Sequence, residues 1–149
     1  AKKLNGDSHL IYSLHGDGEL QEGQIWEAVM IAAGRKVDNL IATIDRNGQQ
    51  IDGPTEEVLP LGDVKTNFEA FGWDVISLKE GNNLKAVIQT MEEAKKRTGK
   101  GKPVAVIMET VMGHGVDFMM HTHAWHGKSP NDEQLERGLS QNPENLVEY

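Results

Sequence analysis

Short apolar runs alternate along the chain with longer segments in which apolar residues recur every three or four positions. The apolar runs predict four strands, at residues 10–14, 40–44, 73–77 and 103–108. The periodic segments predict four helices: residues 24–36, residues 63–71, one capped by Asn82 or Asn83 that runs to about Arg97, and one capped by Asn131 or Asp132 that runs through Leu139. Strands that alternate with helices indicate an α/β fold with a mainly parallel sheet flanked by helices.

The first two strands are almost wholly apolar, which is typical of parallel strands that are covered on both faces. We therefore expect residues 10–14 to form a buried strand that ends at His15. A chain of 149 residues is long enough for a core of its own, so residues 1–149 are interpreted as one domain. A long loop, residues 113–129, follows the last strand, and residues 140–149 are expected to form a polar C-terminal tail.

Composition narrows the classes of function. The chain has 15 Lys and Arg against 23 Asp and Glu, a formal net charge of −8, which disfavours binding to nucleic acid or to an anionic membrane. It contains no cysteine, so disulfides and thiolate chemistry are excluded. No apolar run approaches the roughly 20 residues of a membrane-spanning helix. We expect a cytoplasmic protein without a signal peptide, and the start at Ala1 suggests a processed or truncated piece.

Polar residues follow the first two predicted strands at matching points. The triplet Gly16-Asp17-Gly18 ends the first strand region and Asn47 ends the second, a spacing typical of one strand–helix–strand repeat. Because the carboxyl ends of parallel strands share one edge of the sheet, the carboxylate and the amide oxygen should converge there. With the backbone carbonyl of Gln49 they would suit Mg²⁺, and the N–H of Gly18 would suit a phosphate. The alternative is that both sites are ordinary turns.

Three histidines, His121, His123 and His126, lie in the long loop. One interpretation is zinc binding through the imidazole nitrogens. A second is proton transfer near a phosphate or a sugar hydroxyl. A third, for His121 and His123, is a polar surface loop, and His114 is left without an assigned role.

Charged residues gather at two helix ends. Glu19 and Glu22 lie near the start of the helix predicted at residues 24–36, where carboxylates complement the helix dipole, whereas Glu27 lies further along it. Basic residues at positions 95–102 lie at a helix C-terminus, where cations are favourable, and no aromatic residues are interleaved with them. Both groups are interpreted first as solvated surface.

The motif residues together resemble transketolase. They are Gly-Asp-Gly-Glu-Leu-Gln-Glu-Gly at 16–23, Asn47, Ile-Asp-Gly at 51–53, Ala-Trp-His-Gly-Lys at 124–128 and Pro-Asn-Asp at 130–132. Leu-Gln-Glu-Gly and Ile-Asp-Gly favour transketolase over deoxyxylulose-phosphate synthase, and the resemblance covers about residues 10–139. The chain is similar to the N-terminal, thiamine-diphosphate-binding section of transketolases that bacteria encode in two pieces, and so resembles a truncated or split subunit.

The resemblance implies a role for each matched position. Asp17, the Asn47 side chain and the Gln49 carbonyl would ligate Mg²⁺, although family members often carry an aliphatic side chain where this chain has Gln49. His126 would lie near the diphosphate and the substrate as the catalytic residue. Glu22 and Glu27 match acidic residues at the family's dimer interface, which makes Glu27 a buried or interfacial acid. The implied cofactor-binding residues are Gly16, Asp17, Gly18, Glu19, Asn47, Gln49 and His126.

The resemblance also implies an activity and a partner. Transketolase transfers a two-carbon ketol unit from a ketose phosphate to an aldose phosphate, with thiamine diphosphate and Mg²⁺ as cofactors. The cofactor lies between two domains of different subunits, the diphosphate domain and the pyrimidine-binding domain. A homo- or hetero-oligomer is therefore expected, and the isolated chain should be inactive. The alternative is a non-catalytic module that binds magnesium and a diphosphate or simply a second protein chain.

Overall fold

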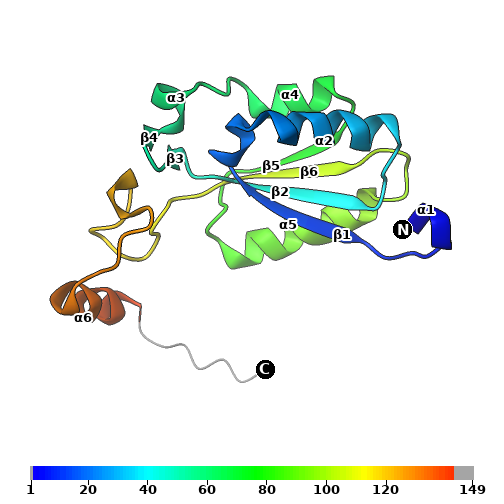
Figure 1. Cartoon of the computed structure of the whole chain (residues 1–149). Coiled ribbons are helices and arrows are strands. Elements are labelled where there is room, and N and C mark those ends of the chain that lie inside the picture. Colours follow the sequence, from blue (N-terminus) through cyan, green and yellow to red (C-terminus); the bar gives the residue numbers. More distant parts are fainter. Residues whose placement is uncertain (1, 143–149) are drawn as a thin grey trace.

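The computed structural model describes residues 2–142 and confirms the α/β class (Figure 1). Its sheet has four strands: β1 Ile11–Gly16, β2 Leu40–Arg46, β5 Asp74–Leu78 and β6 Val104–Glu109. They lie in the order β1-β2-β6-β5, and each neighbouring pair is parallel. All four strands therefore end at the same edge, as the alternation of strands and helices predicts.

The four predicted helices are present. They are α2 Gly23–Gly34, α4 Val64–Ala70, α5 Leu84–Arg97 and α6 Asp132–Gln141, and a short α1 spans Lys2–Asn5. Helices α5 and α6 begin after Asn83 and Asn131, each one of the two caps that the sequence predicts there. The side chains of Asp63, Asn83 and Asn131 each accept a hydrogen bond from a backbone N–H in the first turn of the helix that follows. None of the described helices is long and apolar enough to cross a membrane.

The core is split by the sheet into two apolar clusters, one on each face. In β2, Ala42 and Ile44 face the cluster that contains Val29 of α2 and Phe68 of α4. Ile41, one residue out of phase, belongs to the other cluster with Ala94 of α5. This alternation is the two-residue period of a strand with both faces covered. Parts of α2 and α4 therefore cover one face and α5 the other (Figure 1).

The expectation that residues 10–14 form a buried strand is wrong. Ile11, Tyr12 and Leu14 of β1 are 54%, 49% and 69% exposed. The reason is position, because β1 lies at the edge of the described sheet and pairs only with β2, while the helices pack over the inner strands (Figure 1).

Several short elements interrupt segments that the sequence predicts as loops. They are η1 Glu19–Gln21, β3 Gln49–Gln50 paired with β4 Gly53–Pro54, α3 Thr55–Val58 and η2 His123–Trp125. α6 includes Ser140 and Gln141, which belong to the predicted polar tail, and residues 143–149 of that tail lie outside the described part of the chain.

The segment after β6 forms a lobe beside the carboxyl edge of the sheet, and we call residues 113–142 the C-terminal lobe (Figure 1). Phe118 and Trp125 pack edge to face with centroids 5.1 Å apart. Arg137 of α6 lies over the Phe118 ring and pairs with Asp117 at 2.5 Å. The lobe thus has aromatic and ionic contacts of its own, and it carries His126.

Candidate functional site

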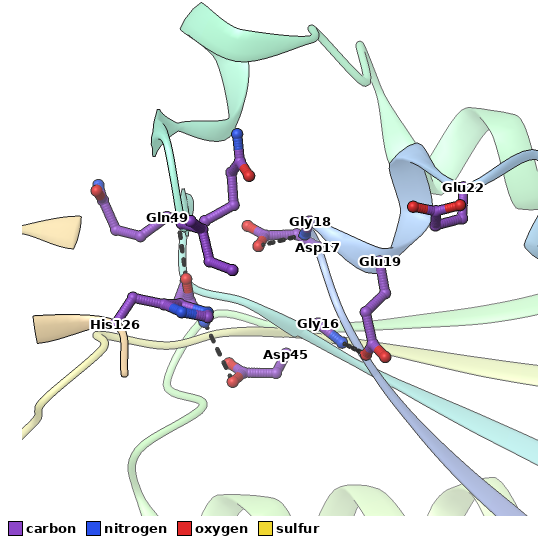
Figure 2. Close-up of a pocket in the computed structure, with 11 residues that line it drawn as sticks. Gly16, Asp17, Gly18, Glu19, Glu22, Asp45, Gln49 and His126 are labelled. Carbon is purple, nitrogen blue, oxygen red and sulfur yellow. Dashed lines mark hydrogen bonds between the residues drawn. The ribbon is translucent and has the colours of Figure 1, made fainter. Parts of the chain in front are cut away.

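A cavity of about 480 Å³ opens at the carboxyl edge of the sheet, where β1 and β2 end (Figure 2). In the figure His126 lies on one side of the cavity and Glu22 on the other, with Asp17 between them. All seven residues predicted to bind the cofactor line it, together with four others; the full lining is Gly16, Asp17, Gly18, Glu19, Glu22, Asp45, Asn47, Gln49, Gln50, Ile51 and His126.

Asp17 is the buried carboxylate of this cavity and is only 1% exposed. Its Oδ2 accepts a hydrogen bond from the N–H of Gly48 at 2.6 Å, and its Oδ1 accepts one from the N–H of Gly18 at 2.9 Å. Burial raises the pKa of Asp17, and the two N–H groups offset only part of that effect. A carboxylate held in this way is stabilised in its charged form by a cation.

The Asn47 side chain is held by two hydrogen bonds, one that it donates and one that it accepts. Its Nδ2 donates to Oδ2 of Asp45 at 3.2 Å, and its Oδ1 accepts from the N–H of Gln49 at 2.9 Å. The other oxygen of Asp45 accepts from the hydroxyl of Thr110. Sequence reasoning missed Asp45 and Thr110. Their only sequence signal is that each lies at or just after the end of a strand, and the contact between them depends on the β2–β6 register.

The loop after β1 packs closely on β3, where Gly18 lies next to Gln50. A Cβ atom at Gly18 would lie 2.8 Å from Cβ of Gln50, so a side chain at position 18 would force the two segments apart. Among the described residues, Nε2 of Gln50 is a buried donor without a hydrogen-bond partner. A buried unpaired donor costs free energy, and an anionic oxygen in the cavity would satisfy it. The cavity therefore fits a phosphate group beside a cation held by Asp17.

The glutamates near the cavity have different surroundings. The Glu19 carboxylate accepts a hydrogen bond from the N–H of Gly16, the last residue of β1, at 2.7 Å (Figure 2). Glu22 lines the cavity at the start of α2. Glu27 is exposed on α2, so it is not a buried acid within this chain, and its place at an interface stays a prediction.

The three loop histidines differ in whether they line the cavity. His126, which is exposed, lines the cavity, whereas His121 and His123 do not. Within residues 2–142 no group of three His, Cys, Asp or Glu side chains is arranged to hold a metal ion, so the zinc interpretation is wrong for the described residues. His114 lines a different polar hollow with Lys79, Glu80 and Glu109.

Comparison with known proteins identifies the family. The domain described as "Transketolase, thiamine diphosphate binding domain" matches residues 3–143. The chain belongs to the transketolase family. The cavity lies within the matched residues and so belongs to a thiamine-diphosphate-binding domain.

Relatives of this transketolase-family chain include proteins named as transketolase subunits. It is 40% identical over 131 residues to the 6-deoxy-6-sulfo-D-fructose transketolase subunit of Clostridium sp. (strain MSTE9), covering 88% of this chain and 46% of the relative. It is 38% identical over 141 residues to an apulose-4-phosphate transketolase subunit of Actinobacillus succinogenes, covering 95% and 50%. The chain thus spans about half the length of these relatives.

A solved structure confirms the fold. The crystal structure of a transketolase R525L mutant from Pichia stipitis superposes with a TM-score of 0.81 at 32% identity. The superposition covers 91% of this chain and 19% of that protein. The parallel sheet and its helices are therefore those of part of the transketolase N-terminal domain.

Proposed function

We propose that this chain holds the magnesium-diphosphate end of thiamine diphosphate in a transketolase that moves a two-carbon ketol unit from a ketose phosphate to an aldose phosphate. The observation that carries the proposal is the convergence of Asp17, Asn47 and Gln49 on one cavity of a domain of this family. The relatives named as transketolase subunits support the same class of reaction.

Three oxygens of this chain would hold Mg²⁺: a carboxylate oxygen of Asp17, Oδ1 of Asn47 and the carbonyl of Gln49. Hard oxygen donors of this kind, completed by phosphate oxygens and water, are what Mg²⁺ prefers. Each Asp17 oxygen accepts one backbone N–H, which orients the carboxylate and leaves a lone pair on each oxygen. Burial raises the pKa of Asp17, and the nearby positive charge of the cation would lower it again.

The remaining residues would act on the phosphate and the substrate. Gln50 lines the cavity, and its unpaired Nε2 would be a donor for a diphosphate oxygen. The N–H of Gly18 donates to Oδ1 of Asp17 in this structure, so it would have to leave that carboxylate to bind a phosphate as the sequence predicts. When bound, thiamine diphosphate supplies the carbon nucleophile that carries the two-carbon unit. His126, exposed on the C-terminal lobe at the cavity mouth, would donate or accept a proton at a hydroxyl of the sugar phosphate.

A partner is part of the proposal. The relatives are named as transketolase subunits, which supports a partner chain, and we infer that a pyrimidine-binding domain in another segment or chain completes the site. Met30 and Ile31 of α2, 49% and 64% exposed, form an apolar surface beside Glu27 that suits such a contact. The isolated chain would then bind the cofactor weakly and be inactive, and the assembly, a homo- or hetero-oligomer, would work in the cytoplasm.

Calorimetry of thiamine diphosphate with Mg²⁺ tests the proposal, using the chain alone and the chain assembled with its pyrimidine-binding partner. We expect weak binding by the chain alone, tight binding by the assembly, and no magnesium-dependent binding by an Asp17→Ala assembly. Turnover of a ketose phosphate donor is then measured. Turnover by the chain alone would contradict the need for a partner, whereas binding without turnover by the assembly would favour the non-catalytic module.

A further inference from the structure

Asp45 lies at the end of β2, two residues before the proposed magnesium ligand Asn47, and both of its carboxylate oxygens are engaged within the protein. Oδ2 accepts from Nδ2 of Asn47 at 3.2 Å, and Oδ1 accepts from the hydroxyl of Thr110. The backbone carbonyl of Asp45 also accepts from the N–H of Asp17 at 3.1 Å. Asp45 thus contacts two of the three proposed metal ligands, Asn47 and Asp17, while its carboxylate is occupied by side chains of the protein.

Thr110, which holds Asp45, is itself fixed from two sides. Its N–H donates to the carbonyl of Arg46 at 3.2 Å, which ties the segment after β6 to the end of β2. Gly81, in the segment after β5, donates to the carbonyl of Glu109 at 2.9 Å. A Cβ atom at Gly81 would lie 2.7 Å from the methyl carbon of Thr110, so only a glycine allows this approach. The ends of three strands therefore converge on the contact between Thr110 and Asp45.

An amide side chain presents an oxygen or an NH₂ group depending on which way it is turned, and only the oxygen ligates a cation. At Asn47 the carboxylate of Asp45 requires a donor, and the N–H of Gln49 requires an acceptor. Together these partners allow one orientation. Oδ1 retains a second lone pair beyond the one that Gln49 uses.

We propose that Asp45 is a positioning residue that holds the amide of Asn47 with its oxygen available to Mg²⁺, and that Thr110 in turn holds Asp45. The inference rests on the proposed function, because it assumes that Asn47 ligates magnesium. Asp45 acts through Asn47 and does not itself touch the cation. A contribution from the charge of Asp45 alone is the competing explanation, and substitutions at Thr110 separate the two because they leave that charge in place.

The experiment measures the Kd for Mg²⁺ at saturating thiamine diphosphate in the complete assembly. Loss of a residue that orients a metal ligand typically weakens metal affinity about 10- to 100-fold, and we expect this for Asp45→Asn. Thr110→Val removes one hydrogen bond and should raise the Kd roughly 2- to 10-fold, with Thr110→Ser restoring affinity. Thr98→Val is the matched control, because the Thr98 hydroxyl bonds the carbonyl of Lys95 at the far end of α5.

Two further readouts distinguish positioning from a general structural effect. The melting temperature of the metal-free assembly should change little in Thr110→Val relative to Thr98→Val. Saturating Mg²⁺ should restore kcat in Thr110→Val, since the defect lies in metal affinity and not in the reaction. If Asp45→Asn fails to fold, the comparison of Thr110→Val with Thr110→Ser decides the question.

The outcomes distinguish failure of the role proposed for Asp45 from failure of the proposed function itself. Unchanged Mg²⁺ affinity in both Asp45→Asn and Thr110→Val, with binding abolished by Asp17→Ala, would overturn the role of Asp45 and leave the proposed function standing. Equal loss in Thr110→Val and Thr110→Ser would also overturn it, because the hydroxyl would not matter. Failure of the unmodified assembly to bind Mg²⁺ and thiamine diphosphate would overturn both.

Discussion

At the scale of single residues, the cavity contains buried polar groups that find only some of their hydrogen-bond and charge partners within the chain. The Asp17 carboxylate is buried beside a second carboxylate, Asp45, and Nε2 of Gln50 is buried without a partner. Such arrangements cost stability in the absence of a ligand. A cation beside Asp17 and an anion beside Gln50 would satisfy both groups, as the proposed magnesium diphosphate would.

The first prediction concerns the charge of Asp17. Because burial raises its pKa in the folded state, its contribution to stability is present at acid pH and is lost as the pH rises through that raised value. Metal-free Asp17→Asn should therefore gain in melting temperature relative to the unmodified chain as the pH rises from about 4 to 7, since the normal pKa of Asp is about 3.9. Thermal unfolding across this range checks it, and identical pH profiles for the two proteins would contradict it.

The second prediction concerns Gln50. Replacing it by leucine removes a buried unpaired donor, so the free energy of unfolding of the ligand-free chain should stay level or rise by about 1 kcal/mol. The affinity of the complete assembly for thiamine diphosphate with Mg²⁺ should fall roughly 10-fold, the loss expected for a hydrogen bond to a charged group. Denaturant unfolding and calorimetry test the two halves. The matched control is the same substitution at an exposed glutamine, Gln89→Leu. Gln21 is unsuitable as a control, because its side-chain amide donates hydrogen bonds to the carbonyls of Thr55 and Leu59.

At the scale of elements, local signals explain what the sequence could predict. Apolar periodicity and caps such as Asn83 place the main helices and strands to within two residues at their ends. The exposure of β1 was not predictable in this way, because strand order is set by tertiary packing and not by the strand's own composition. The two-residue strands β3 and β4 are too short for any period to show.

The same reasoning explains the site. Asp17 and Asn47 could be paired from sequence because their spacing matches one repeat of the fold. Asp45 and Thr110 could not, since their contact joins residues 65 apart through the β2–β6 register. His126 could be identified through its motif, but its place at the cavity depends on the packing of the C-terminal lobe.

The third prediction concerns the start of α6. Asn131 and Gln134 form a reciprocal capping box, with side-chain to backbone bonds of 2.9 and 3.0 Å. Asn131→Ala should destabilise the C-terminal lobe by about 1 kcal/mol. Amide hydrogen exchange should therefore become faster in α6 while exchange in β2 and β6 is unchanged. Equal acceleration in the sheet would show that the lobe does not open independently, and Asn83→Ala at α5 serves as the comparison.

At the scale of the whole molecule, the described chain exposes apolar side chains on more than one surface. Ile31 lies on α2, and Glu22, the residue just before α2, lines the cavity. Ile88, 54% exposed, lies on α5, which packs against the opposite face of the sheet. The proposed partner completes the site at the cavity, so it should contact the surface of α2. The two isoleucines therefore allow the same substitution to be compared on two helices.

The last prediction uses this pair. A partner that buries Ile31 would have to bury a charge in the Ile31→Glu variant, and an unpaired buried charge is strongly unfavourable. We expect the variant chain to fold as the unmodified chain does, because surface changes usually alter stability by less than about 0.5 kcal/mol. Assembly and cofactor binding should be lost, while Ile88→Glu retains both. Size-exclusion chromatography with light scattering measures assembly, and loss in Ile88→Glu but not in Ile31→Glu would place the partner on the α5 side.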